Sequence, residues 1–304
     1  MFTITAYNNQ YLRLNQNTMQ AVLSIGVDAD ASLAPAPLAI AIALDHSGSM
    51  DGERMSAARD GAIKVVQALD ETMTFLAVTF NNDARIIFGP APGTPENKRR
   101  AVQSLQNVYA NGGTRMSTAL NAIVGKLGQD QTRATKILFL TDGKNEGEKR
   151  ATLNQAIAHC AAVNISVSAW GVGTDWDAAE LRYMADATHG SADIIPTPQQ
   201  IAPAFSTAFS EMRKTAITNT RLFLWSPVGV AIKHIQQVYP SIAPLDMQLD
   251  AANPRQRIVT LGSFAAAEQH EYLCDLEIPI YTPGQQFLML RPGIKYVLAK
   301  TGEQ

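Results

Sequence analysis

Residues 38–50 of this chain read LAIAIALDHSGSM, and they indicate both a buried strand and a candidate binding loop. Its first seven residues are apolar and have the length of a buried β-strand. One carboxylate and two hydroxyls follow within five residues, at Asp45, Ser47 and Ser49, where the chain turns towards a helix. These hard oxygen donors suit a small hard cation such as Mg2+. Taken alone the motif is weak evidence, because aspartate and serine are ordinary helix caps, so the interpretation depends on ligands from distant loops.

The segment from about residue 37 to 213 alternates apolar runs of strand length with patterns of helical period. The runs are apolar throughout, which is typical of strands covered by helices on both faces. We therefore predict an α/β fold with a doubly wound, mostly parallel, Rossmann-like sheet. A short polar turn joins the runs 75–80 and 84–88, which indicates a hairpin and one antiparallel edge strand. The predicted strands are 38–44, 75–80, 84–88, 136–140, 165–171 and 193–195, and the predicted helices are 55–69, 96–108, 116–127, 148–163, 177–187 and 198–213.

The residue pattern changes at about Thr215. Beyond it the helical period is lost, and short strand-like segments are broken by proline and glycine. The N-terminal residues also alternate in a strand-like way, yet neither end is long enough to form a sandwich alone. We predict that residues 1–33 and 215–304 together form an all-β sandwich, with the α/β domain of residues 37–213 inserted into it or preceding it. Residues 30–37 are the expected linker. The predicted strands of these regions are 2–7, 10–14, 18–28, 220–225, 228–238, 256–262, 269–278, 286–290 and 294–299.

Composition excludes several classes of protein. The formal net charge of −2 does not indicate binding to nucleic acid. The basic cluster at 98–100 lies in a helical pattern, which indicates a solvated face of a helix. Cys160 and Cys274 follow no metal-binding spacing and are interpreted as buried small apolar residues. No stretch approaches the ~18 apolar residues of a membrane-spanning helix. The N-terminus lacks a secretory pattern, so a cytoplasmic location is expected.

Two later loops at the same predicted edge of the sheet carry further oxygen donors. Thr114 follows paired glycines at the start of a predicted helix, and Asp142 follows the apolar strand 136–140. In a doubly wound sheet, loops at the carboxyl ends of neighbouring strands converge on one site. Three hydroxyls and two carboxylates from three loops are far less expected by chance than the first motif alone.

With these residues in place, the segment 37–213 resembles a von Willebrand factor A domain of bacterial type. The five donors match the family's metal-ion-dependent adhesion site one by one: Asp45, Ser47 and Ser49 in Asp-x-Ser-x-Ser, Thr114 after the paired glycines, and Asp142 in Thr-Asp-Gly. The Gly-Val-Gly at 171–173 is also typical of the family. More loosely, residues 238–240, 259–264 and 270–279 resemble the β-sandwich that flanks this domain in some bacterial proteins and in inter-alpha-trypsin inhibitor heavy chains.

The resemblance implies a role for each donor. Ser47, Ser49 and Thr114 would bind the cation directly, while Asp45 and Asp142 bind it directly or through water. Octahedral Mg2+ takes six oxygens, so five protein donors leave one position for an outside carboxylate. Mg2+ is the expected cofactor, with Mn2+ or Ca2+ as alternatives. In the competing interpretation, the two aspartates merely cap helices.

Four residues near these loops are candidate partner contacts: His46, Met50, Arg115 and Trp176. Each has a structural alternative, because a histidine can point away from the metal, a methionine can sit in the core and a tryptophan can pack under its own loop. Arg54 and Arg115 are expected to pair with neighbouring acids such as Asp51, Glu53 or Asp60.

These features favour a non-enzymatic, metal-dependent binding module that captures an acidic side chain of a protein partner. Similar bacterial domains often act as adaptors beside AAA+ ATPases, kinases or phosphatases, so a partner of that kind is expected. The sequence has neither a phosphate-binding loop nor a nucleophile elbow. Two alternatives stay open: a hydrolase or phosphatase that uses the same cation, and a scaffold whose β-sandwich does the recognition.

Overall fold

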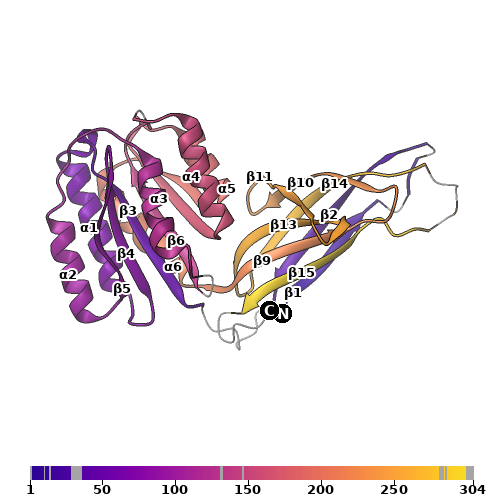
Figure 1. Cartoon of the computed structure of the whole chain (residues 1–304), viewed down its shortest axis with the longest axis horizontal. Helices are drawn as coiled ribbons and strands as arrows, with labels where there is room; N and C mark the ends of the chain where they lie inside the picture. The colour runs from indigo at the N-terminus through magenta and orange to yellow at the C-terminus, as the bar shows by residue number, and fades with distance from the viewer. Residues whose placement is uncertain are drawn as a thin grey trace. The chain divides into compact units, whose positions relative to one another are not determined.

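The computed structural model describes residues 2–9, 11–13, 15–28, 36–130, 133–145, 147–280, 284 and 286–298. The chain divides into two compact units, which are residues 35–215 and a second unit made of residues 1–34 and 216–304. The first is an α/β unit and the second contains antiparallel sheets (Figure 1).

A six-stranded sheet with the order β5-β4-β3-β6-β7-β8 forms the centre of the α/β unit. Its strands are β3 (Leu38–Asp45), β4 (Thr74–Phe80), β5 (Ala84–Pro92), β6 (Ala134–Thr141), β7 (Ile165–Val172) and β8 (Ser191–Ile195). Neighbouring strands are parallel except β4 and β5, which form the antiparallel hairpin. The predicted mostly parallel sheet with one antiparallel edge strand is confirmed.

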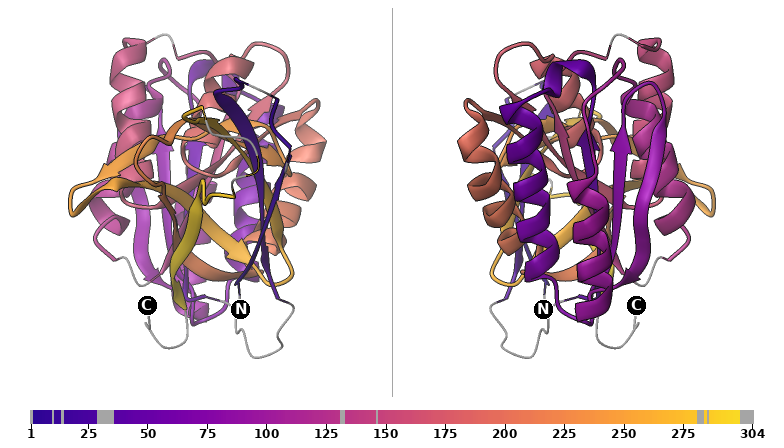
Figure 2. Two further views of the ribbon diagram at one scale, coloured as in Figure 1. Left: turned by 90° about the vertical axis from the view of Figure 1, so that its right-hand side faces the viewer. Right: turned by 90° about the vertical axis from the view of Figure 1, so that its left-hand side faces the viewer.

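Helices flank this sheet on both sides (Figure 2). They are α1 (Glu53–Ala68), α2 (Pro95–Gln106), α3 (Met116–Leu127), α4 (Arg150–Ala162), α5 (Ala178–Ala187) and α6 (Ile201–Met212), with single 3-10 turns at Gly48–Met50 and Pro198–Gln200. Gly52 separates the first of these turns from α1 at a φ of 77°, a conformation that glycine adopts without strain. The chain thus turns sharply between the oxygen-rich loop and the first helix.

Strand β3 explains why the opening stretch belongs at the centre of the sheet. All eight of its residues are buried. Ala39, Ala41 and Ala43 share an apolar cluster with side chains of α3, α4 and α5. Because side chains alternate along a strand, Ile40 and Ile42 face the opposite side of the sheet. On one side small alanines allow close helix packing, and on the other larger residues fill the core.

The second unit contains two antiparallel sheets. One has the order β1-β2-β14-β10-β11 and the other β12-β13-β9-β15. Residues 18–26 of the N-terminal β2 pair with all of β14, so strands from both ends of the chain share a sheet. One apolar cluster draws side chains from both sheets, including Leu23 and Tyr272 from the first and Leu222 and Phe264 from the second. The strands are β1 (Phe2–Asn8), β2 (Thr18–Val27), β9 (Thr215–Trp225), β10 (Ala231–Tyr239), β11 (Ala243–Pro244), β12 (Met247–Asp250), β13 (Asn253–Ala265), β14 (Gln269–Glu277) and β15 (Arg291–Leu298).

Two predicted strands of this unit are wrong. Residues 11–13, the described part of the predicted strand 10–14, and residues 286–290 have no strand conformation. Leu12, Met289 and Leu290 nevertheless pack against the apolar cluster. Their apolar pattern reflects packing without a partner strand. The short strands β11 and β12 were not predicted from the sequence. Most of the expected linker 30–37 lies outside the described residues.

Both cysteines are fully buried, as the sequence predicts. Burial raises the pKa of each thiol to about 12, so Cys160 and Cys274 stay protonated near neutral pH. In the part of the chain that the structure describes, no helix is long and apolar enough to cross a membrane.

Candidate metal centre

The two aspartates of the candidate site lie at the carboxyl edge of the central sheet. Asp45 is the last residue of β3, and Asp142 directly follows β6. These strands are parallel neighbours with Leu44 opposite Leu140, so both carboxylates emerge at the same edge. Both aspartates are fully buried.

Asp45 is held by hydrogen bonds to both carboxylate oxygens. Its Oδ1 accepts a bond of 2.8 Å from the backbone N–H of Ser47, and its Oδ2 accepts one of 2.5 Å from Oγ1 of Thr141. Burial raises the pKa of Asp45 from 3.8 to about 6, and the negative charge of Asp142 adds to that rise. The hydrogen bonds from Thr141 and Ser47 act in the opposite direction. Asp45 is therefore a fixed and costly buried charge in the absence of a cation.

A chain of hydrogen bonds links the serines to Asp142. Oγ of Ser49 donates to Oδ1 of Asp142 at 2.7 Å and lies 3.1 Å from Oγ of Ser47. Ser47 is buried, whereas Ser49 is exposed. Because Ser49 gives its proton to a carboxylate, the lone pairs of its oxygen remain available to a cation.

Thr114 closes the site from the third loop. A methyl group added at Gly143 would lie 3.2 Å from Oγ1 of Thr114 and 3.7 Å from Oγ of Ser49. The two hydroxyls thus border a space that any larger residue at position 143 would fill. This cradle of hydroxyls and carboxylates has the donor chemistry of a hard-cation site.

Backbone and asparagine bonds lock the three loops together. The N–H of Gly48 donates to the carbonyl of Gly112 at 3.0 Å, and the N–H of Asn111 donates to the carbonyl of His46 at 2.7 Å. From the hairpin between β4 and β5, Oδ1 of Asn82 accepts a bond of 3.1 Å from the N–H of Gly113. Our prediction treated this hairpin turn only as a connection, although its position at the same sheet edge was a usable signal.

Asn81, next to Asn82, binds the same loop. Its side chain donates to Oδ1 of Asn111 at 2.7 Å, and its carbonyl accepts from the N–H of Arg115 at 2.7 Å. The residues immediately before and after Thr114 are therefore both held from the hairpin.

The loop between β6 and α4 holds the start of α3, two residues after Thr114. The carboxylate of Glu148 accepts from the backbone N–H of Ser117 at 2.9 Å and also from its hydroxyl. Nε of Arg115 donates to the carbonyl of Gly147 at 2.7 Å. Sequence reasoning missed Glu148 because its partner in the first turn of α3, Ser117, lies 31 residues earlier in the chain, where no local cap pattern appears.

Arg54 does not pair as the sequence predicts. Nη1 of Arg54 lies 2.6 Å from Oδ2 of Asp142, and the expected ion pairs with Asp51, Glu53 or Asp60 are not found among the described residues. The guanidinium is thus a direct neighbour of the candidate metal centre.

The candidate partner contacts have different surroundings. His46 is half-buried, with Nδ1 3.1 Å from the carbonyl oxygen of Tyr109, and burial lowers its pKa. Met50 is fully buried and offers no surface to a partner in this structure. Arg115 is exposed, apart from its bond to the neighbouring loop. Trp176 is half-buried, and its Nε1 donates to the carbonyl of Gly173 at 2.9 Å.

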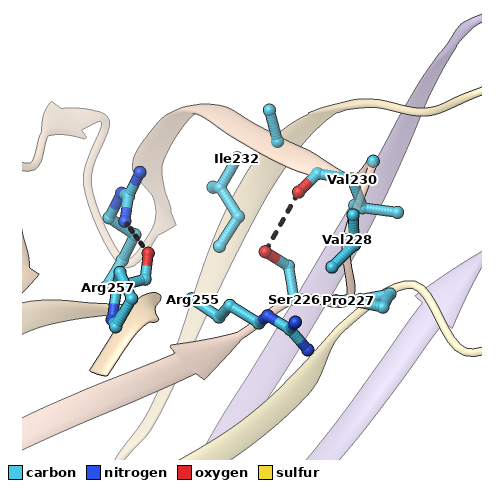
Figure 3. Close-up of a pocket in the computed structure, with 10 residues that line it drawn as sticks. Ser226, Pro227, Val228, Val230, Ile232, Arg255 and Arg257 are labelled. Atoms are coloured by element: carbon cyan, nitrogen blue, oxygen red, sulfur yellow. Dashed lines mark hydrogen bonds between the residues drawn. The ribbon is translucent and has the colours of Figure 1, made fainter.

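Other parts of the molecule offer less chemistry. The described residues contain no group of three or more histidine, cysteine, aspartate or glutamate side chains that could hold a metal. In the unit of antiparallel sheets, a cavity of about 200 Å³ is lined by residues 226–232 together with Pro254, Arg255 and Arg257 (Figure 3). The hydroxyl of Ser226, which lines the cavity, already donates a hydrogen bond to the carbonyl of Val230 at 3.1 Å. We assign no chemistry to this cavity.

Comparison with known proteins identifies a family to which the sequence is similar. The model of the von Willebrand factor type A domain matches residues 39–202, which is more than half of the chain. An uncharacterized protein of Synechocystis sp. is 26% identical over 250 residues, covering 81% of this chain and 58% of that protein. The chain thus spans little more than half the length of this relative.

Solved structures of similar fold include von Willebrand factor type A from Catenulispora acidiphila. It has a TM-score of 0.89 at 26% identity and covers 96% of this chain and 68% of its own. Proximal thread matrix protein 1 from the mussel byssus, described with zinc occupying its metal-ion-dependent adhesion site, has a TM-score of 0.50 at 18% identity. It covers 62% of this chain and 48% of its own, and the likeness concerns the fold alone.

Proposed function

Because the chain belongs to the von Willebrand factor type A domain family, we propose that it is a metal-dependent protein-binding module. The cation would be held by Asp45, Ser47, Ser49, Thr114 and Asp142. One observation carries the proposal: the hydroxyl oxygens of Thr114 and Ser49 lie 3.2 Å and 3.7 Å from where a methyl group would stand at Gly143, and Ser49 donates a hydrogen bond to Asp142.

Each residue has a distinct task in this proposal. The hydroxyl oxygens of Ser47, Ser49 and Thr114 would face the cation. Asp45 and Asp142 orient these groups and supply the negative charge, since each carboxylate is already bonded to a residue of the serine loop. When bound, the cation would offer a coordination position to a glutamate or aspartate of a protein partner. Hydroxyl and carboxylate oxygens favour Mg2+, with Mn2+ or Ca2+ as alternatives.

The remaining parts of the chain fit a supporting role. We propose that residues 37–213 form the binding domain, and that residues 1–33 and 215–304 form a β-sandwich. The apolar cluster shared by the two antiparallel sheets supports this assignment. We propose no catalytic step for the chain.

Isothermal titration of the full chain with MgCl2 tests the proposal. We expect one site in the wild type, with binding lost in Asp45→Ala and weakened in the milder variant Thr114→Ala. Asp175→Ala, which removes an exposed aspartate, is the matched control and should bind as the wild type does. Undiminished binding in a folded Asp45→Ala variant would reject the assignment.

A second experiment separates binding from catalysis. Pull-downs with and without EDTA should recover a partner only when the metal is present and only with intact Asp45. A phosphatase and esterase screen with Mg2+ or Mn2+ should show no turnover. Metal-dependent turnover that disappears in Asp142→Ala would favour a hydrolase, and partner capture that is insensitive to EDTA would favour recognition by the β-sandwich.

A further inference from the structure

Arg54 places a positive charge directly on the candidate metal centre. Its Nη1 lies 2.6 Å from Oδ2 of Asp142, a carboxylate with no exposed surface, and 3.4 Å from the carbonyl oxygen of Ser49. The other carboxylate oxygen of Asp142 accepts the hydroxyl of Ser49. Both oxygens of Asp142 are therefore engaged, one by a metal-facing hydroxyl and one by a cation of the protein itself.

The position of Arg54 on its helix is unfavourable without this contact. It is the second residue of α1, and the N-terminal end of a helix carries partial positive charge that repels a cation. The pairing with buried Asp142 offsets that repulsion. An ion pair with a buried carboxylate is strong because little water screens it.

The loop that follows β7 also leaves room for the guanidinium. Nη2 of Arg54 lies 3.2 Å from where a methyl group would stand at Gly173, in the loop that follows β7. Gly173 has a φ of 75°, so any other residue there would be strained as well as crowded. The guanidinium of Arg54 thus contacts Asp142 and the carbonyl of Ser49 and lies close to Gly173.

A divalent cation among the three hydroxyls would share Asp142 with this guanidinium. Asp45 and Asp142 provide two negative charges, and Arg54 neutralises part of that charge before any metal arrives. Like charges gathered around one buried carboxylate repel each other, so the guanidinium weakens the hold of the site on a second cation.

We propose that Arg54 is a tethered counter-cation that steadies Asp142 in the metal-free protein and thereby lowers the affinity of the site for divalent metal. The inference rests on the proposed function, and it adds a residue that lowers the affinity of the proposed metal site. The affinity is set by the competition between a bound ion and an arginine of the same chain.

Titration with MgCl2 of the full chain and of three variants tests this inference. Arg54→Met keeps an aliphatic side chain but removes the charge, and it should bind Mg2+ at least about tenfold more tightly than the wild type. Arg54→Lys keeps the charge and should stay close to the wild type. Arg182→Met is the matched control, since Arg182 is exposed and its ion pair with Asp186 lies within α5.

Thermal unfolding gives a second readout. In EDTA, Arg54→Met should melt several degrees below the wild type, because Asp142 loses its counter-charge, and Mg2+ should raise its melting temperature by more than it raises that of the wild type. Equal or weaker Mg2+ binding by Arg54→Met, with the wild type binding, would overturn the inference alone. If neither protein binds Mg2+, the proposed function fails as well; binding by the variant alone would support the inference.

Discussion

Thr141 and Asp45 are 96 residues apart in the sequence, yet Oγ1 of Thr141 donates a 2.5 Å hydrogen bond to Oδ2 of Asp45. Both side chains are fully buried at the ends of the neighbouring strands β6 and β3. This bond fixes the carboxylate so that its other oxygen meets the backbone of Ser47. The serine loop is therefore oriented by a residue that the family motif contains but that the predicted ligand set omits.

The buried carboxyl of Asp45 should make the metal-free protein less stable as the pH rises. Its pKa is about 6 in the folded protein, against 3.8 for an ordinary aspartate, so the folded state holds its proton more tightly than the unfolded state does. Between pH 4 and 7 the free energy of unfolding should fall, relative to Asp45→Asn, by roughly 2 kcal/mol. Urea unfolding in EDTA at several pH values measures this difference. A constant difference between the two proteins would contradict it, and Asp175→Asn serves as a control.

Asn82 should position Thr114 without touching a bound metal. Removing its side chain in Asn82→Ala leaves the N–H of Gly113 without its acceptor, which should weaken Mg2+ binding by about fivefold. Asn82→Asp keeps an acceptor oxygen and should restore most of the affinity. Asn107→Ala, at the C-terminal end of α2, should have no effect on the titration. Wild-type affinity in Asn82→Ala would show that the hairpin does not position the loop.

Glu148 should stabilise the start of α3. In Glu148→Ala, the N–H and hydroxyl of Ser117 lose their shared acceptor, and the free energy of unfolding should fall by about 1–3 kcal/mol. Urea unfolding in EDTA tests this, with the exposed Glu71→Ala as control. Because Thr114 precedes this helix, Mg2+ affinity should fall too; unchanged stability would remove Glu148 from the account.

Gly171 should be required for the packing of Trp176. A methyl group at this position would lie 2.1 Å from the indole ring, so Gly171→Ala must displace the ring and break its bond to Gly173. We expect a red shift of tryptophan emission, absent when the same change is made in Trp176→Phe. Gly125→Ala meets no atom within 4 Å and should leave the emission unchanged. No shift in Gly171→Ala would mean that the indole packs elsewhere.

The sheet and the five candidate donors could be predicted because both depend on local patterns in the sequence. Strand β3 is apolar up to Asp45, and each donor ends or follows a strand or lies just before a helix. The parallel order of β3 and β6 then brings Asp45 and Asp142 to one edge, as the topology of such sheets requires.

The contacts that position the donors were not predictable in this way. Arg54 meets Asp142 across 88 residues, and Asn82 meets Gly113 across 31, so no spacing rule links these pairs. Arg54 has nearer acids in the sequence, yet burial makes the distant Asp142 the stronger partner. The strand predicted at residues 286–290 is wrong because apolar side chains can pack on a core without forming a strand.

The proposed cation site can be located by diffraction from a crystal of the full chain soaked in MnCl2, measured for the anomalous signal of manganese. We expect one peak in contact with the hydroxyls of Ser47, Ser49 and Thr114, absent in crystals of Asp45→Ala. Ordered side chains without a peak among them, or a peak bound elsewhere and unaffected by Asp45→Ala, would contradict it.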